Sequence, residues 1–197
     1  GLNADSTAVV IGAMLISPLL GPILGLGLSI STNDIDTLKS SITNTLVMVL
    51  LSIGTAYIFF ISIPISEETP ELLSRTSPDI RDVLIAFFGG LALIIAKTKK
   101  ENISSAIFGV AIATALMPPL CTVGYYLAEG ELLKARGAII LFLINTLYII
   151  IATYLTLKFL RFPLIVYANS KRRKLISGSI ALIAITSLVF AIFNFKG

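Results

Sequence analysis

The stretch from Ala8 to Ile30, AVVIGAMLISPLLGPILGLGLSI, constrains the fold more than any other part of the sequence. It carries no charge over about 23 residues, which is long enough to cross the hydrocarbon core of a bilayer. Pro18 and Pro22 stand near its middle, where proline breaks or kinks a helix. We therefore predict a transmembrane helix that is interrupted at mid-depth, and the alternative is a merely kinked structural helix.

Small residues in this stretch recur at every fourth position: Ala13, Ser17, Gly21, Gly25 and Ser29. Residues with this spacing share one face of a helix, and a face of small residues lets another helix backbone approach closely. The pattern predicts that this face contacts protein and not lipid.

A second stretch, Ala106 to Ala128, aligns with the first without gaps and carries Pro118 and Pro119. Four residue pairs coincide in this alignment: Gly12 with Gly109, Leu19 with Leu116, Pro22 with Pro119, and Gly27 with Gly124. Two Pro-interrupted apolar segments in matching positions are typical of transporters built from repeats.

A further correspondence joins Asn44-Thr45-Leu46 to Asn145-Thr146-Leu147, with one insertion or deletion between the halves. We predict repeat halves at about 1–64 and 78–161. Each repeat unit would contain an odd number of spans, so the two units would insert with opposite topology as an inverted repeat.

The composition is that of a membrane protein. The chain is 56% hydrophobic and 13% charged, about half of the roughly 25% usual in soluble domains. Its mean hydropathy is +0.96. We predict an all-α, polytopic bundle that forms a single transmembrane domain over 1–197. About six spans are expected, near residues 7–30, 38–63, 78–96, 102–128, 135–160 and 175–195, with a short surface helix at Pro70–Arg75.

Several chemistries are excluded by residue content. The chain has no His and one Cys, Cys121, so His/Cys metal sites, disulfides and His-based acid–base catalysis are not expected. No Asp, Glu, Lys or Arg falls inside a predicted membrane core, which argues against a carboxylate-based proton pump. Neither a Ser–Lys pair nor paired Asp residues lie at depth. We expect no enzyme activity, no cofactor, no metal and no nucleic-acid partner.

The candidate site consists of neutral polar groups and of backbone carbonyls freed at the prolines. Broken helices offer N–H groups to anions and carbonyls to cations. The predicted substrate-binding residues are Ser17, Pro18, Gly21, Pro22, Asn44, Thr114, Pro118, Pro119, Thr122 and Asn145. We expect a polar cavity between the two broken helices, with Asn44 and Asn145 at its edges. The alternative for each Asn is an ordinary hydrogen bond between helices.

Lys and Arg are distributed unequally between the two ends of the predicted spans, with ten on one side and five on the other. The richer side is predicted to be cytoplasmic, and the acidic loop Ser66–Asp82 external. The basic run Lys171, Arg172, Arg173 and Lys174 is a topology determinant or a site for anionic lipid. We expect a multi-pass protein of the cell (inner) membrane, with the bilayer as its partner and homo-oligomer formation left open.

Three separated motifs resemble those of one family. They are STAVVIGAMLISPLLGPI at 6–23, Arg75-Thr76-Ser77-Pro78 with Asp82, and GVAIA at 109–113 running to Pro118-Pro119-Leu120. The chain is similar to a prokaryotic membrane family catalogued as domain of unknown function 389, a conserved hydrophobic domain. The resemblance implies that a helix, and often a soluble region, precedes the first motif, so the chain is expected to be truncated at its N-terminus.

The family brings no established substrate, and two functions stay open at this stage. One is a transporter or channel for a small solute or ion, with its site between the two Pro-interrupted helices. The other is a membrane anchor or signalling platform for an N-terminal soluble region. A polar cavity at mid-depth would favour transport, and a solid apolar core would favour the anchor.

Overall fold

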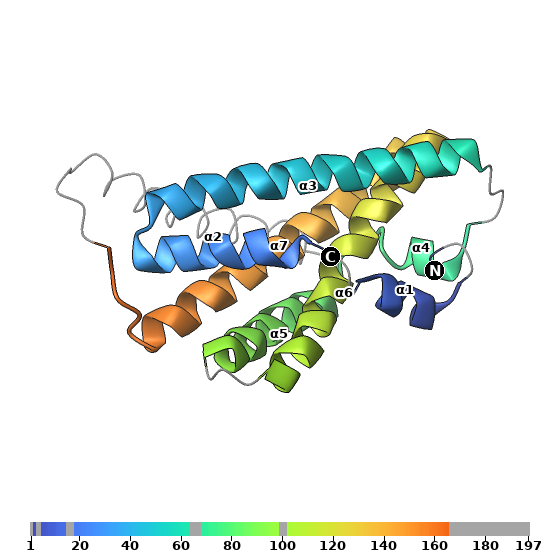
Figure 1. The fold of residues 1–197 in the computed structure, drawn as a ribbon. Helices are drawn as coiled ribbons and strands as arrows, with labels where there is room; N and C mark the ends of the chain where they lie inside the picture. Colours follow the sequence, from blue (N-terminus) through green and yellow to red (C-terminus); the bar gives the residue numbers. More distant parts are fainter. Residues whose placement is uncertain (1, 3–4, 15–17, 64–67, 99–101, 166–197) are drawn as a thin grey trace.

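A computed structural model describes residues 2, 5–14, 18–63, 68–98 and 102–165 of the chain. Within these ranges the protein forms seven α-helices and no strand, which confirms the predicted all-α class. Among the described residues, two helices, α3 and α7, are long and apolar enough to cross a membrane, judged by length and composition. The predicted final helix at 175–195 lies outside the described residues. The helices shown in Figure 1 are α1 (Thr7–Met14), α2 (Leu20–Thr32), α3 (Ile35–Ser62), α4 (Pro70–Leu73), α5 (Ile80–Thr98), α6 (Asn102–Glu129) and α7 (Leu132–Phe159).

The first apolar stretch is divided between two helices, as its prolines predict. Helix α1 ends at Met14 and α2 begins at Leu20, so Pro18 falls between them. Pro22 lies in the first turn of α2, where its missing N–H costs nothing because first-turn amides have no partner within the helix. The interruption is therefore associated with Pro18, while Pro22 is compatible with the start of α2.

Helix α6 passes through Pro118 and Pro119 without a break, so the predicted interruption of this stretch is wrong. Both prolines are buried, and α6 contacts α1, α2, α3, α5 and α7. A proline in a transmembrane helix is tolerated where neighbouring helices surround it. The packing around α6 thus holds its two halves in one helix (Figure 1).

The helices approach one another closely at glycines. A Cβ added to Gly27 would lie 2.5 Å from the Thr153 Cβ, and one added to Gly90 would lie 2.9 Å from the Ala152 Cβ. Gly25 faces Ser41 of α3 with similarly little room, whereas Gly21 has no atom within 4 Å of an added Cβ. The predicted small-residue face therefore contacts a helix at Gly25 and not at Gly21. Close backbone approach at small residues is characteristic of helix packing in membranes.

The helical hairpins α2–α3 and α6–α7 have the same register. Helix α3 runs from Ile35 to Ser62 and α7 from Leu132 to Phe159, so both have 28 residues and their bounds differ by a shift of 97. The turn residues Asn33 and Gly130, related by the same shift, both have left-handed backbone conformations with φ of 61° and 79°. The two loops that join the helices in each hairpin are therefore equivalent in conformation as well as in position.

This register corrects the predicted pairing of the two Asn-Thr-Leu motifs. Under the shift of 97, Asn44 corresponds to Leu141, and Asn145 corresponds to Met48. Asn44 is exposed on α3, while Asn145 is buried on α7. The two asparagines thus occupy different places in their helices, because no insertion separates the hairpins in this part of the chain.

The two hairpins point in opposite directions. Beyond the end of α7, the Ile165 N–H donates to the Thr32 carbonyl, 2.7 Å away, beside the α2–α3 turn. At the far end of the bundle, the ring of Phe60 in α3 stacks edge-on against Tyr125, with centroids 5.0 Å apart, next to the α6–α7 turn. Each turn therefore lies beside the end of the other hairpin (Figure 1).

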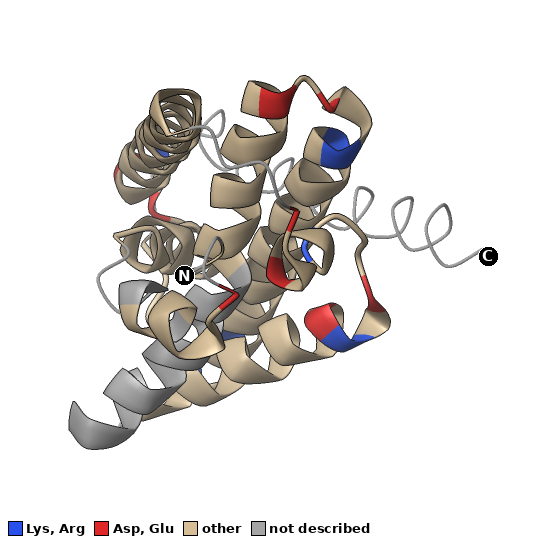
Figure 2. Cartoon of the chain, turned by 90° about the vertical axis from the view of Figure 1, so that its right-hand side faces the viewer, with Lys and Arg blue, Asp and Glu red and all other residues tan. Residues whose placement is uncertain are grey.

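Charged side chains gather at the ends of the helices. Figure 2 views the bundle from the end at which α3 terminates, where Asp, Glu, Lys and Arg mark the loops and helix termini. The sequence has no charged residue from 40 to 66, from 83 to 96 or from 137 to 157. Helices α3, α5 and α7 therefore have apolar middles between charged ends.

Candidate functional site

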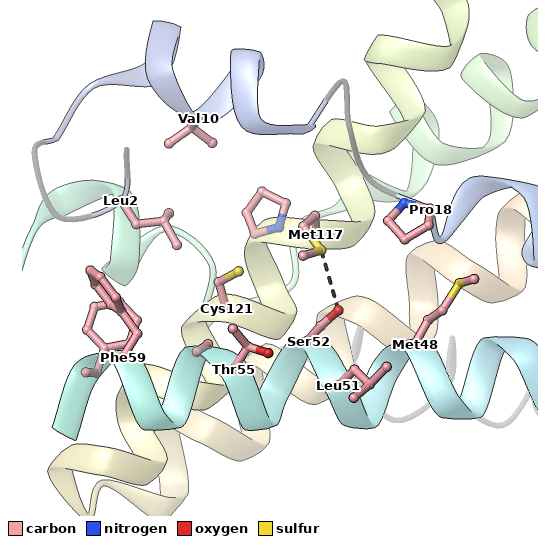
Figure 3. A pocket seen from close by; sticks show the side chains of 13 residues that line it. Leu2, Val10, Pro18, Met48, Leu51, Ser52, Thr55, Phe59, Met117 and Cys121 are labelled. Carbon is pink, nitrogen blue, oxygen red and sulfur yellow. Dashed lines mark hydrogen bonds between the residues drawn. The ribbon is translucent and has the colours of Figure 1, made fainter. Parts of the chain in front are cut away.

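A pocket of about 510 Å³ lies between α1, α3 and α6, next to the break between α1 and α2. We call it the α1–α3–α6 pocket. Most of its wall is carbon, from residues such as Val10 and Phe59. Figure 3 shows α3 along one side and α6 at the back, with Pro18 at the end nearest the break. Pro118 of α6 also lines it, so the pocket contains one proline from each of the two aligned stretches.

The spacing of residues along two helices places the lining side chains. Met48, Ser52 and Thr55 follow one another at intervals of four and three residues on α3, so they share a face. Met117 and Cys121 have the corresponding spacing on α6. The Ser52 hydroxyl donates to the Met117 sulfur at 3.7 Å, which joins the two helices across the pocket (Figure 3).

Some of the predicted site residues lie near this pocket, and others lie elsewhere. Pro18 and Pro118 line it. Pro22, Pro119 and Gly21 are not among the lining residues. Pro22 is half-buried in α2, Pro119 is buried in α6, and Gly21 is exposed. Ser17 lies outside the described residues, and Thr114 lies in a part of α6 whose side chains are not described.

None of the three remaining predicted residues, Thr122, Asn44 and Asn145, is among the lining residues of this pocket. Thr122 is fully buried on α6, and Asn145 is 1% exposed on α7. Asn44 is exposed on α3, where its amide nitrogen donates to the Ser40 hydroxyl at 3.4 Å. The structure therefore does not bring Asn44 and Asn145 together, since they differ in register. The pocket that it does show is largely apolar, in contrast to the polar cavity predicted from the sequence.

Sequence reasoning missed the sulfur-bearing and hydroxyl-bearing side chains of the pocket. Met48, Ser52, Met117 and Cys121 lie inside apolar runs, where Met and Cys usually serve as core residues. The available signal was the four-residue spacing of Met48 with Ser52 and of Met117 with Cys121. That spacing indicates two facing helix surfaces only once the neighbouring helix is known.

Polar contacts close the end of the bundle beyond the pocket. Glu68 accepts a hydrogen bond from the Tyr126 hydroxyl at 2.5 Å and one from the Lys134 ammonium at 2.7 Å. These two donors, led by Lys134, hold the pKa of Glu68 below its ordinary value. The Thr69 hydroxyl donates to the Leu2 carbonyl at 2.6 Å, and Leu2 lines the pocket. Thr69, just before α4, thus holds Leu2 at the end of the bundle beyond the pocket.

The contacts of α1 extend this closure. The Thr7 hydroxyl donates to a Glu71 carboxylate oxygen at 2.7 Å, and Arg75 contacts the other oxygen of Glu71 at 3.4 Å. Among the residues that the structure describes, no three His, Cys, Asp or Glu side chains form a group that could hold a metal ion. The acidic residues here serve as hydrogen-bond acceptors that tie α1 and α4 together.

Comparisons with known proteins give a family and a relative. No solved structure matches the chain. An uncharacterised protein of Methanocaldococcus jannaschii is 35% identical over 153 residues, which cover 76% of this chain and 46% of that relative. The chain therefore spans less than half the length of this relative. Residues 14–151 match the family described as Domain of unknown function (DUF389), and this chain belongs to that family.

Proposed function

We propose that the chain is a multi-pass membrane protein with an inverted repeat, in which α2–α3 and α6–α7 are related by a pseudo-two-fold axis. The support comes from contacts between the hairpins. Gly27 of α2 approaches Ile150 and Thr153 of α7, and Gly124 of α6 approaches Ile53 and Ala56 of α3. The shift of 97 that relates the helix bounds also relates these two contacts residue by residue. Gly27 corresponds to Gly124, Ile150 to Ile53, and Thr153 to Ala56.

Reciprocal contacts are what a two-fold axis produces, because a contact between i and j must recur between their equivalents. The distances agree as well. An added Cβ would lie 3.1 Å from the Ile150 carbonyl oxygen at Gly27, and 3.0 Å from the Ile53 carbonyl oxygen at Gly124. Since the two hairpins run in opposite directions, the axis would lie in the plane of the membrane, as in inverted-repeat transporters.

A bilayer location is supported by what the bundle exposes. Leu46, Leu50 and Ile61 of α3 are each more than half exposed, on the face opposite the pocket. Large aliphatic side chains on an outer face, between charged helix ends, suit the hydrocarbon core of a membrane. The orientation follows the Lys and Arg distribution, with the α2–α3 turn cytoplasmic and the loop around α4 external.

We propose further that this bundle passes a small solute or ion across the membrane, with its site at the α1–α3–α6 pocket. One observation carries the proposal: the helix break at Pro18 opens onto a pocket between the two repeat halves. Discontinuous helices at a repeat interface hold substrate in many transporters, because the broken ends present backbone N–H and C=O groups.

The pocket wall favours a small solute of low charge. Its side chains offer the hydroxyls of Ser52 and Thr55 and the thiol of Cys121, and otherwise mainly carbon and thioether sulfur. A highly charged molecule would lose its hydration in such a pocket without gaining ionic partners. Backbone groups at the break would supply the polar contacts that the side chains lack.

Reconstituted vesicles test this proposal. Osmotic swelling would be followed by light scattering with a series of small neutral solutes and monovalent salts. Ser52→Phe should fill the pocket and abolish any flux that the unmodified protein supports, whereas Leu50→Phe, on the opposite face of α3, should leave it unchanged. Equal flux in the unmodified protein and the Ser52→Phe variant would show that the solute does not pass through this pocket. No flux with any solute would favour the membrane anchor.

A further inference from the structure

Helix α1 and the residue Leu2 form the wall of the α1–α3–α6 pocket that faces α3. Val10 of α1 and Leu2 line the pocket together with Thr55 and Phe59 of α3. Figure 3 shows Leu2 and Val10 on the side of the pocket opposite α3. The position of α1 therefore decides whether the pocket is covered on that side.

This wall is held by few apolar contacts. Among the α1 residues whose side chains the structure describes, Val10 alone is buried, and Leu2 packs against it. A Cβ added to Gly12 of α1 would have no atom within 4 Å, whereas one added to Gly27 of α2 would meet the facing helix at 2.5 Å. A segment with few buried apolar contacts opens at a lower free energy than the rest of a fold. The break at Pro18 also separates α1 from α2, so the two helices are not one rigid rod.

Helix α4, which lies beside α1, is firmly seated by comparison (Figure 1). Leu72 of α4 is fully buried in a cluster with Phe60 of α3 and Tyr126 of α6. Beyond α4, the Thr76 carbonyl oxygen lies so close to Gly137 of α7 that an added Cβ would overlap it. Apolar burial and close packing thus fix α4 to the long helices, and α4 is a stable support for α1.

Glu71 of α4 makes two of the contacts that hold α1 against this support. Its carboxylate accepts a hydrogen bond from the Thr7 hydroxyl at 2.7 Å, and its backbone N–H donates to the Asp5 carboxylate at 3.3 Å. Arg75 contacts the second carboxylate oxygen at 3.4 Å and so keeps the first one turned toward Thr7. Both hydrogen bonds are exposed. Water can replace exposed hydrogen bonds, so they break and re-form at modest cost.

We propose that α1 is a lid that opens the α1–α3–α6 pocket to the external side of the membrane, and that Glu71 is its latch. The proposal rests on the solute site proposed above, whose access it describes. The structure shows the latched arrangement. Opening would break the bond between Thr7 and Glu71 and carry Val10 away from α3, while α4 stays in place. Because the loop around α4 lies on the side assigned as external from the Lys and Arg distribution, solute would enter or leave there.

The single cysteine of the chain reports on this movement, because Cys121 of α6 lines the pocket and is half-buried. Protein in lipid nanodiscs would be treated with a methanethiosulfonate reagent, and the rate of Cys121 modification would be followed by mass spectrometry. Thr7→Val and Glu71→Ala should each raise this rate about fivefold, since the loss of one hydrogen bond raises the open population by roughly that factor. The double variant should react no faster than either single variant, because both changes remove the same bond.

Two control variants separate the lid from general loosening of the bundle. Asp79→Ala removes an exposed acid of the same loop whose ion pair is with Arg81 and not with α1. Asp34→Ala removes the cap of α3 at the opposite end of the bundle. Neither should change the rate of Cys121 modification. Melting temperatures would be measured for every variant, and Thr7→Val, which changes one exposed side chain, keeps the test available if Glu71→Ala fails to fold.

Three outcomes would overturn the proposal. Unchanged rates in Thr7→Val and Glu71→Ala would show that their bond does not restrict access to the pocket. An equal rise in Asp34→Ala would show that the reagent enters by unfolding of the whole bundle. Multiplied effects in the double variant would show that the two side chains act separately and not as one latch. Modification of Cys121 requires no solute flux, so a failure of the transport proposal in the vesicle assay would be distinct from a failure of this one.

Discussion

Helices α3 and α7 have the same length and register but different surroundings. Half of the most apolar window of α7 is buried, against 11% of that of α3. The difference comes from α5, which lies against α7 and α6. In the two hairpins, equivalent positions share their helical backbone geometry, while the helices packed around each position differ.

The sequences of the two helices follow this difference. Buried positions of α7 carry the polar residues Asn145, Thr153 and Thr156. Their counterparts on α3 are Met48, Ala56 and Phe59. Polar side chains in a membrane protein lie where other helices surround them, and this condition holds for α7 within the described structure. The α3 positions carry apolar residues, and all three of them line the pocket.

The largest effect is expected at the reciprocal glycine contacts. Gly27→Leu and Gly124→Leu should each destabilise the bundle by about 1–3 kcal/mol or more, because the added side chain would meet backbone atoms of the facing helix. Gly21→Leu and Gly54→Leu are controls, since neither glycine has an atom within 4 Å of an added Cβ. Thermal unfolding in detergent would measure all four. Unequal losses at Gly27 and Gly124 would break the equivalence of the two contacts.

A smaller loss is expected at the end of the bundle beyond the pocket. Glu68→Ala should cost about 1–2 kcal/mol, because it removes a charge-assisted acceptor from Tyr126 and Lys134. The check is the melting temperature at pH 7, with the exposed Asp79→Ala as a control that should change it little.

The same residue gives a pH dependence. The pKa of Glu68 is lowered in the folded protein from an ordinary value of 4.5. Its contribution to stability is therefore complete above about pH 4.5 and is lost as the pH falls through the folded-state pKa. Unfolding measured from pH 7 to pH 3 should show a smaller decline in Glu68→Gln than in the unmodified protein. Parallel declines would exclude a role for this carboxylate.

The turns of the two hairpins differ in their helix caps. Asp34 accepts hydrogen bonds from the Thr37 N–H at 3.0 Å and the Asp36 N–H at 3.1 Å, and its counterpart Glu131 makes no such cap. Asp34→Ala should therefore cost about 1 kcal/mol, and Glu131→Ala close to nothing. Chemical unfolding of the two variants would compare them directly. A loss at Glu131 equal to that at Asp34 would contradict the cap assignment.

Much of the helical structure follows from local sequence. The predicted span 102–128 is close to α6, and the signature Thr69-Pro70-Glu71 marks a helix that the Thr69 hydroxyl caps. Charge-free runs and caps are local properties, so they can be recognised without the fold. The continuity of α6 through Pro118 and Pro119 could not be predicted, since it depends on the helices packed around it.

The candidate site was harder to predict for the same reason. Pro18 and Pro118 were identified because a proline is a strong local signal, and both line the pocket. Ser52 and Met117 meet only because α3 and α6 cross at that point, which no local pattern shows. The pairing of Asn44 with Asn145 rested on a three-residue match, too short to fix a register that the helix bounds and turns set differently.

The smallest effect is expected for Gly130→Asn, in the turn between α6 and α7. Gly130 adopts φ of 79°, and its counterpart Asn33 adopts 61°. Asn tolerates the left-handed region better than other non-glycine residues, whereas a β-branched residue is strained there. Gly130→Asn should thus change stability by less than about 0.5 kcal/mol, and Gly130→Val should cost about 1–2 kcal/mol. Unfolding in detergent would measure both. The two turns also share a backbone hydrogen bond, because the Asp34 N–H donates to the Ser29 carbonyl and the Glu131 N–H donates to the Tyr126 carbonyl, both at 2.8 Å. A cost for Gly130→Asn as large as that for Gly130→Val would nevertheless show that the two turns are not interchangeable.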